Sequence, residues 1–166
     1  AFAWMTDLLY FNKVLQIPLT LVHDVCSVSY RDLLEEFLVG SLDSFPVLEE
    51  VRSFFLRRAR EMQSGGPELV SSEEWLNIWW PAGEYMLIQL CVENKLEQFH
   101  EEAEALLTGM VENRSLTLPE GLLHDAALLN RALFKLPFQT EDLDLDLSYN
   151  VWEVFRSRLM GDSLPL

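Results

Sequence analysis

The sequence predicts an all-α protein, an irregular multi-helix bundle of about 7–8 helices with one extended acidic segment near the C-terminus. Three observations predict this class. Apolar residues recur at steps of three and four along nearly every segment, as they do on one face of a helix. Residues that start and stop helices separate these segments. The one stretch with a period of two has no second strand-like segment to pair with.

The first quarter of the chain is its least regular part. We expect a helix around Trp4–Gln16, a break at Pro18, and a second helix from residue 29 or 30 to Gly40. An amphipathic helix should follow over Ser44–Gln63. Its apolar face is formed by Val47, Val51, Phe54, Phe55, Ala59 and Met62. Ser44 can cap its start, and the following Gly-Gly-Pro stops it.

Two further helices are expected between residues 71 and 92. Ser71 and Glu74 form a capping box, and Pro81 suits the first position of the next helix. The stretch Glu84–Val92 is apolar nearly all round, which predicts a helix at the buried centre of the domain. The next helix carries Leu96, Phe99, Ala103, Leu106 and Met110 on one face, with Glu97, Glu101, Glu102 and Glu104 expected outward.

The last part of the chain combines two helices with an extended segment. Thr117 and Glu120 form a capping box before a leucine-rich helix that Pro137 ends. Leucines at 143, 145 and 147 then alternate with aspartates, which fits an extended segment laid over an apolar groove. Ser148 is expected to cap a final helix, with Trp152 on its apolar face.

Composition narrows the class of partner. The 166 residues carry a formal net charge of -15, a field that opposes binding to nucleic acid. No uncharged run reaches the ~20 residues that a membrane span requires, and we expect a cytoplasmic protein. The two cysteines, Cys26 and Cys91, are interpreted as buried thiols. The chain lacks an initiator Met, so we expect residues 1–166 to form a single helical domain of a longer chain.

No catalytic, cofactor-binding or metal-binding residue is predicted. Glu97 and His100 have the Glu-x-x-His spacing of di-metal helical bundles, but the motif occurs once and is interpreted as solvated. His23 and Asp24 lie near two serines, without the G-x-S-x-G turn that exposes a nucleophile.

Aromatic and polar clusters supply the candidate residues of an interface or pocket. Three tryptophans within six residues predict either a pocket or docking face, or a helix joint packed by large side chains, and the packed joint is favoured. Polar residues in apolar runs, including Asn150, are expected to hydrogen-bond the backbone of the extended segment. The candidates are Trp75, Trp79, Trp80, Tyr85, Asn130, Arg131, Gln139 and Trp152.

Three stretches carry a resemblance to a known family. They are SYRDLLEEFL at residues 29–38, WWPAGEYMLIQLCVENKLEQFHEEAEALL at 79–107 and LNRALFKLPFQTEDLDLDLSYNVWEVF at 129–155. The chain resembles the C-terminal helical region of cobalamin-binding radical SAM proteins. For a full-length parent the resemblance implies a 4Fe-4S cluster, S-adenosylmethionine and cobalamin. The C-x-x-x-C-x-x-C motif of that cluster is missing here, so no catalytic residue of the family is carried over.

The resemblance implies a non-catalytic accessory domain that packs on the upstream catalytic domain of the same polypeptide and shapes its substrate site. Two alternatives stay open. One is an autonomous helical module that binds a protein partner through residues 75–85 or the acidic segment. The other, less favoured, is a helical-bundle metalloprotein centred on Glu97 and His100.

Overall fold

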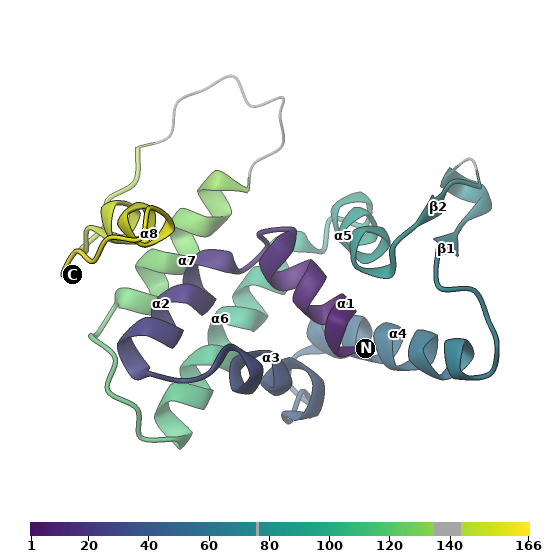
Figure 1. The fold of residues 1–166 in the computed structure, drawn as a ribbon, viewed down its shortest axis with the longest axis horizontal. Helices are drawn as coiled ribbons and strands as arrows, with labels where there is room; N and C mark the ends of the chain where they lie inside the picture. The colour runs from purple at the N-terminus through teal and green to yellow at the C-terminus, as the bar shows by residue number, and fades with distance from the viewer. Residues whose placement is uncertain (76, 135–143) are drawn as a thin grey trace.

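The protein is an all-α chain of packed helices, as the sequence predicts, and the described residues also contain a small β-hairpin that was not predicted (Figure 1). The computed structural model describes residues 1–75, 77–134 and 144–166. Within these ranges the α-helices are α1 Phe2–Thr6, α2 Gln16–Cys26, α3 Tyr30–Val39, α4 Pro46–Gln63, α5 Ala82–Val92, α6 Leu96–Asn113, α7 Leu122–Leu133 and α8 Val151–Leu159. A π-type turn, η1 (Asp7–Phe11), continues α1. None of these helices is both long and apolar enough to cross a membrane.

The main core lies where α1, α3, α4, α5 and α6 meet. Its largest fully buried side chains include Phe37, Phe55 and Phe99, one from each of α3, α4 and α6. Most of the apolar spacing predicted for α4 and α6 is therefore confirmed, whereas Met62, predicted on the apolar face of α4, is 41% exposed. Ser29 caps α3, since its hydroxyl accepts the Asp32 N–H at 3.1 Å.

A second, smaller core joins α2, α7 and α8 at the other end of the molecule (Figure 1). α2 belongs to both cores, because Ile17 and Leu21 face the small one while Leu19 and Val22 face the main one. Leu145 and Leu147 pack on the small core, and the neighbouring Asp144 and Asp146 are exposed. This confirms the expected placement of residues 144–147, whereas Leu143 lies outside the described residues.

The predicted break at Pro18 is wrong. Pro18 lies in the first turn of α2, where a missing N–H costs nothing because that donor has no helical partner. The chain bends instead at residues 12–15, between η1 and α2, and Lys13 there has a left-handed backbone with φ of 62°.

The first of the two helices expected between residues 71 and 92 is replaced by a β-hairpin, whereas the second is present as α5. Val70 pairs with Trp80 and Ser71 with Trp79 in the antiparallel strands β1 (Val70–Ser71) and β2 (Trp79–Trp80). Among the described residues between these strands, a short 3-10 turn, η2 (Glu73–Trp75), is the only helical element. The predicted capping box at Ser71 is therefore wrong.

α5 is not the buried centre that its sequence predicts. Met86 and Leu90 face the main core, while Val92 is exposed and Leu87 and Cys91 are half-buried. α5 is therefore apolar on nearly all sides, with one face in the main core and another on an open surface.

Glu102 corrects the prediction that the glutamates of α6 point outward. Its side chain is buried, and Oε2 accepts the backbone N–H groups of Val47 and Leu48, each at 2.9 Å. These are donors of the first turn of α4 that have no helical partner. Ser44, the predicted cap, makes no such bond, so α4 is capped by a carboxylate from another helix.

Asp125 of α7 does the same for the segment that leads into α8. Its buried carboxylate accepts the N–H groups of Ser148 and Tyr149 at 2.7 and 2.9 Å. The predicted caps at Ser148 and at Thr117–Glu120 are wrong, because α8 begins after Asn150 and α7 after Gly121, with no side-chain cap at either residue.

Gly83→Ala should lower the free energy of unfolding by about 1–3 kcal/mol through overpacking. A Cβ on Gly83 would lie 3.0 Å from Cγ and 3.1 Å from Cβ of Asp7, where η1 meets α5. Gly109 in α6 is the matched control, since its Cβ would meet nothing within 4 Å. Gly109→Ala should therefore raise stability by about 0.5–1 kcal/mol. Urea denaturation measures both, and equal effects would contradict the close approach.

Glu102→Ala should destabilise the fold by about 1–3 kcal/mol, because it leaves two buried backbone donors of α4 without an acceptor. The adjacent Glu101 is exposed and supplies the control. Glu101→Ala should change stability by less than about 0.5 kcal/mol. Thermal and urea unfolding of the two variants would contradict the cap if both behaved alike.

Candidate functional site: an apolar groove

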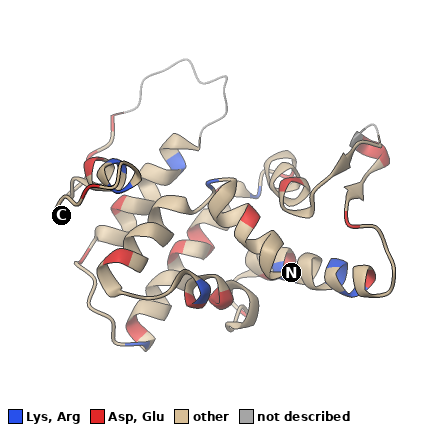
Figure 2. Cartoon of the chain, viewed as in Figure 1, with Lys and Arg blue, Asp and Glu red and all other residues tan. Residues whose placement is uncertain are grey.

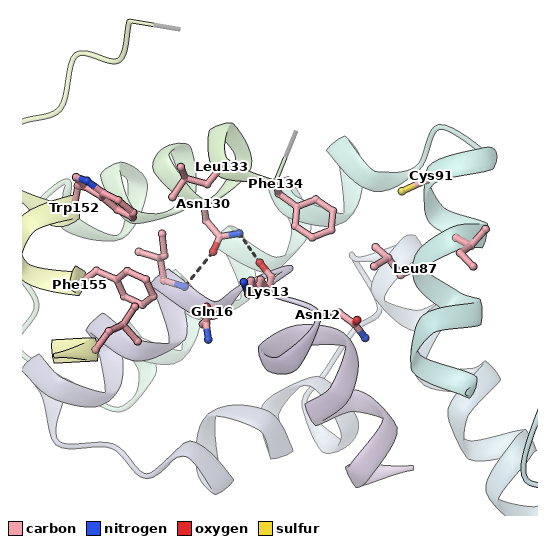
Figure 3. Close-up of a pocket in the computed structure, with 13 residues that line it drawn as sticks. Asn12, Lys13, Gln16, Leu87, Cys91, Asn130, Leu133, Phe134, Trp152 and Phe155 are labelled. Carbon is pink, nitrogen blue, oxygen red and sulfur yellow. Dashed lines mark hydrogen bonds between the residues drawn. The ribbon is translucent and has the colours of Figure 1, made fainter. Parts of the chain in front are cut away.

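An open groove of about 730 Å³ lies between the η1–α2 bend, α5, α7 and α8 (Figure 3). Each element supplies one wall. The lining residues are Asn12, Lys13, Gln16, Ile17, Leu87, Ile88, Cys91, Asn130, Leu133, Phe134, Trp152, Phe155 and Leu159. The groove follows from the two-core arrangement, because it lies between the small core and the outward face of α5.

The walls of the groove are mostly apolar and partly open to solvent. Leu133 is 54% exposed and Trp152 is 37% exposed. In Figure 3, Trp152 and Phe155 face Leu87 and Cys91 across the groove. Burial raises the pKa of the Cys91 thiol, so it remains neutral in this wall. Exposed apolar side chains that gather in a hollow are typical of a binding surface.

Asn130 fixes the floor of the groove. Its Oδ1 accepts the Ile17 N–H at 3.0 Å and its Nδ2 donates to the Lys13 carbonyl at 3.1 Å (Figure 3). Its Nδ2 also donates to the Val14 carbonyl at 2.6 Å. From the sequence, this amide is expected to bond the backbone of the extended segment if it is buried. The structure shows that it is buried and corrects its partner, which is the bend that precedes α2.

The charges around the groove are unevenly distributed. Of the lining residues that the structure describes, Lys13 is the only charged one, in a chain with 27 acidic residues. Carboxylates are spread along the helices elsewhere (Figure 2). A second cation lies nearby, since the Arg156 guanidinium carbon is 5.6 Å from the centre of the Trp152 ring.

The candidate residues named from the sequence separate into different places. Asn130 and Trp152 both line the groove. Trp79 is 56% exposed on the hairpin, where Trp80 is half-buried, so neither fills the packed helix joint that was favoured. Tyr85 stacks on Phe54 with 5.6 Å between ring centres, and it packs against the main core.

Arg131, among the remaining candidates, does not line the groove. Arg131 pairs with Glu97 at 2.9 Å on the outer surface. Trp75 ends η2, and Gln139 lies outside the described residues. The exposed Asn150 donates to the Pro165 carbonyl at 3.3 Å rather than to the extended segment.

His100 and Glu97 do not converge on a common site. Glu97 is exposed, as expected, but His100 is 3% exposed and lies edge-on to Phe134 with 6.2 Å between ring centres. Burial, together with the Arg131 cation, lowers the pKa of His100 to about 4. The prediction that His100 is solvated is therefore wrong, and the ring is neutral near pH 7.

The Ser-His-Asp set is also dispersed. His23 stacks on Tyr30, while Asp24 pairs with Arg158 at 2.7 Å. Burial raises the pKa of Tyr30 to about 12, which keeps its hydroxyl protonated. Within the described residues, no group of three or more His, Cys, Asp or Glu side chains is placed to hold a metal ion.

Comparison with protein-family models, with curated proteins and with solved structures gave no match. The site is therefore defined by its own geometry. Sequence reasoning missed Lys13, Gln16, Leu87 and Leu133 as members of one site, because they come from three separate elements. The apolar character of α5 on all faces was the one signal that pointed to a second buried or binding face.

Stability should fall with decreasing pH partly because of His100. The folded-state pKa of about 4 lies below the ordinary 6.5, so this group contributes stability above pH 6.5 that is lost as pH falls toward 4. At about 1.4 kcal/mol per pKa unit the loss reaches about 3 kcal/mol. His100→Gln removes the titrating ring, so the variant does not have this pH-dependent loss of stability. The difference in free energy of unfolding between wild type and variant should therefore narrow from pH 7 to pH 4. Denaturant titrations at each pH measure the gap, and a constant gap would contradict a neutral buried ring.

Proposed function

We propose that this chain is a helical accessory domain of a larger enzyme of the cobalamin-binding radical SAM type, and that its groove forms one wall of the substrate site. The observation that carries the proposal is the groove itself, where exposed apolar side chains such as Leu133 and Trp152 surround about 730 Å³ of open volume. A surface of this kind binds a partner or ligand that covers it.

The stretches that carry the resemblance also build the groove. Leu87, Ile88 and Cys91 come from the stretch at 79–107, and Asn130, Leu133, Phe134, Trp152 and Phe155 come from that at 129–155. If these stretches belong to the family, then in the folded chain they come together at a binding surface. This supports a role in binding rather than in folding alone.

The 4Fe-4S cluster implied for the parent does not fit the cysteines of this chain. A 4Fe-4S cluster requires three or four cysteine ligands, and the chain has two cysteines. Cys26 lies near the Thr117 carbonyl, with 3.6 Å between the atoms, while Cys91 lines the groove. We therefore assign the cluster to the upstream part of the proposed parent.

The alternative proposal is an autonomous module that binds a protein partner through the hairpin. Its support is the exposure of Leu69, Ile78 and Trp79 there, since large apolar side chains gathered on a projecting hairpin favour a protein contact (Figure 1). The reading frame upstream of Ala1 separates the two. Three cysteines in C-x-x-x-C-x-x-C spacing support the accessory domain, and a start codon directly before Ala1 supports the module.

In the full-length parent, Leu133→Asp should leave iron and cobalamin content unchanged but reduce substrate turnover by about tenfold or more, because a carboxylate is placed in the apolar wall. Val39→Asp is the control, since Val39 is 79% exposed on α3 and does not line the groove. Equal turnover in the two variants would contradict the role of the groove. Stoichiometric iron or cobalamin in the purified 166-residue chain would contradict the accessory role.

A further inference from the structure

The groove has the charge pattern of an anion site within an acidic protein. The chain has 27 acidic and 12 basic residues, yet among the described residues that line the groove Lys13 is the only charged one. Within the described part of the chain, the Lys13 ammonium has no ion-pair partner, although the other described lysine, Lys95, pairs with Glu50 and Glu93. A cation that no carboxylate neutralises remains available to a ligand.

The backbone at Lys13 gives no structural reason for a lysine. Its φ of 62° is a left-handed conformation that glycine adopts more easily than a residue with a Cβ. Its carbonyl accepts a bond from Asn130, but any residue could supply that oxygen. Lys13 therefore has an unfavourable backbone conformation, and its side chain forms no hydrogen bond or ion pair within the described residues.

Other polar and charged groups around the groove also favour a negatively charged ligand. Gln16 lines the groove, and in the described residues its side-chain amide has no hydrogen-bond partner. α2 begins at Gln16, so the positive end of its helix dipole lies beside Lys13. Arg156, over the Trp152 ring, adds positive charge near the opposite wall.

We infer that the groove binds an amphiphilic carboxylate, a small molecule with one carboxyl group and an aliphatic or aromatic body. The carboxylate contacts Lys13 and Gln16, and the body lies along the apolar walls formed by Leu87, Leu133 and Trp152. A volume of about 730 Å³ is within the range of small-molecule sites. The inference rests on the proposed role of the groove as a binding surface and adds the chemical class of its ligand.

The test is calorimetric titration of the 166-residue chain with decanoate below its micelle concentration, beside 1-decanol as the neutral probe. Decanoate should bind at one saturable site, about tenfold more tightly than decanol, because only the carboxylate forms charge-assisted bonds. Amide chemical shifts should move at the bend before α2 and in α5, α7 and α8.

Variants at Lys13 distinguish a ligand contact from a structural role. Lys13→Gln should weaken decanoate binding about tenfold and leave decanol binding unchanged. Lys95→Gln, which changes the net charge equally, should change neither. Lys13→Gly should lose the same decanoate affinity while the melting temperature rises, because glycine relieves the left-handed backbone. A lysine needed for folding would give a lower melting temperature instead.

Each remaining outcome is decisive. Equal binding of decanoate and decanol, or an unchanged decanoate affinity in Lys13→Gln, overturns the carboxylate inference but leaves the proposed accessory domain standing. Chemical shifts confined to the hairpin overturn it as well, because the probe would then bind elsewhere. Loss of turnover in the Leu133→Asp parent without any carboxylate selectivity would show that the groove binds a ligand of another class.

Discussion

The arrangement of this protein depends on one buried amide. The chain must bend between η1 and α2, and Val14 and Ile17 are buried there, so their backbone groups need partners away from water. Asn130, on α7 and more than a hundred residues further along the chain, forms hydrogen bonds with three backbone groups of the bend: the carbonyls of Lys13 and Val14 and the N–H of Ile17. The amide therefore determines where α2 begins, and the positions of both cores and of the groove follow from that start.

Buried carboxylates apply the same principle at two other places. Glu102 binds the first N–H groups of α4, and Asp125 binds those that precede α8. In each case a polar side chain on a long helix replaces the local cap that sequence rules place beside the helix start. Local segments are thus positioned by tertiary contacts, and a charged group in the core is tolerated because backbone donors surround it.

This explains how far the sequence could predict the structure. The spacing in α4 and α6 predicted both helices and their buried faces, because apolar periodicity depends on neighbours along the chain alone. The roles of Glu102 and Asp125 could not be predicted, since a polar residue on a helix is assigned to solvent unless its distant partner is known. The groove was missed for the same reason: Lys13, Leu87 and Leu133 meet only in the folded chain. Asn130 was anticipated as a buried amide but not with its true partners.

The division of α2 between two cores affects how the molecule would open. α8 is held by the small core and by the Asp24–Arg158 pair, so it can detach without disrupting Phe37, Phe55 and Phe99. Amide protons of α8 should then exchange with solvent through a partial opening, at a lower free energy than those of α4. α2 cannot detach in this way, because its buried side chains belong to both cores and its detachment would disrupt both. It is the element through which strain in one half of the molecule reaches the other half.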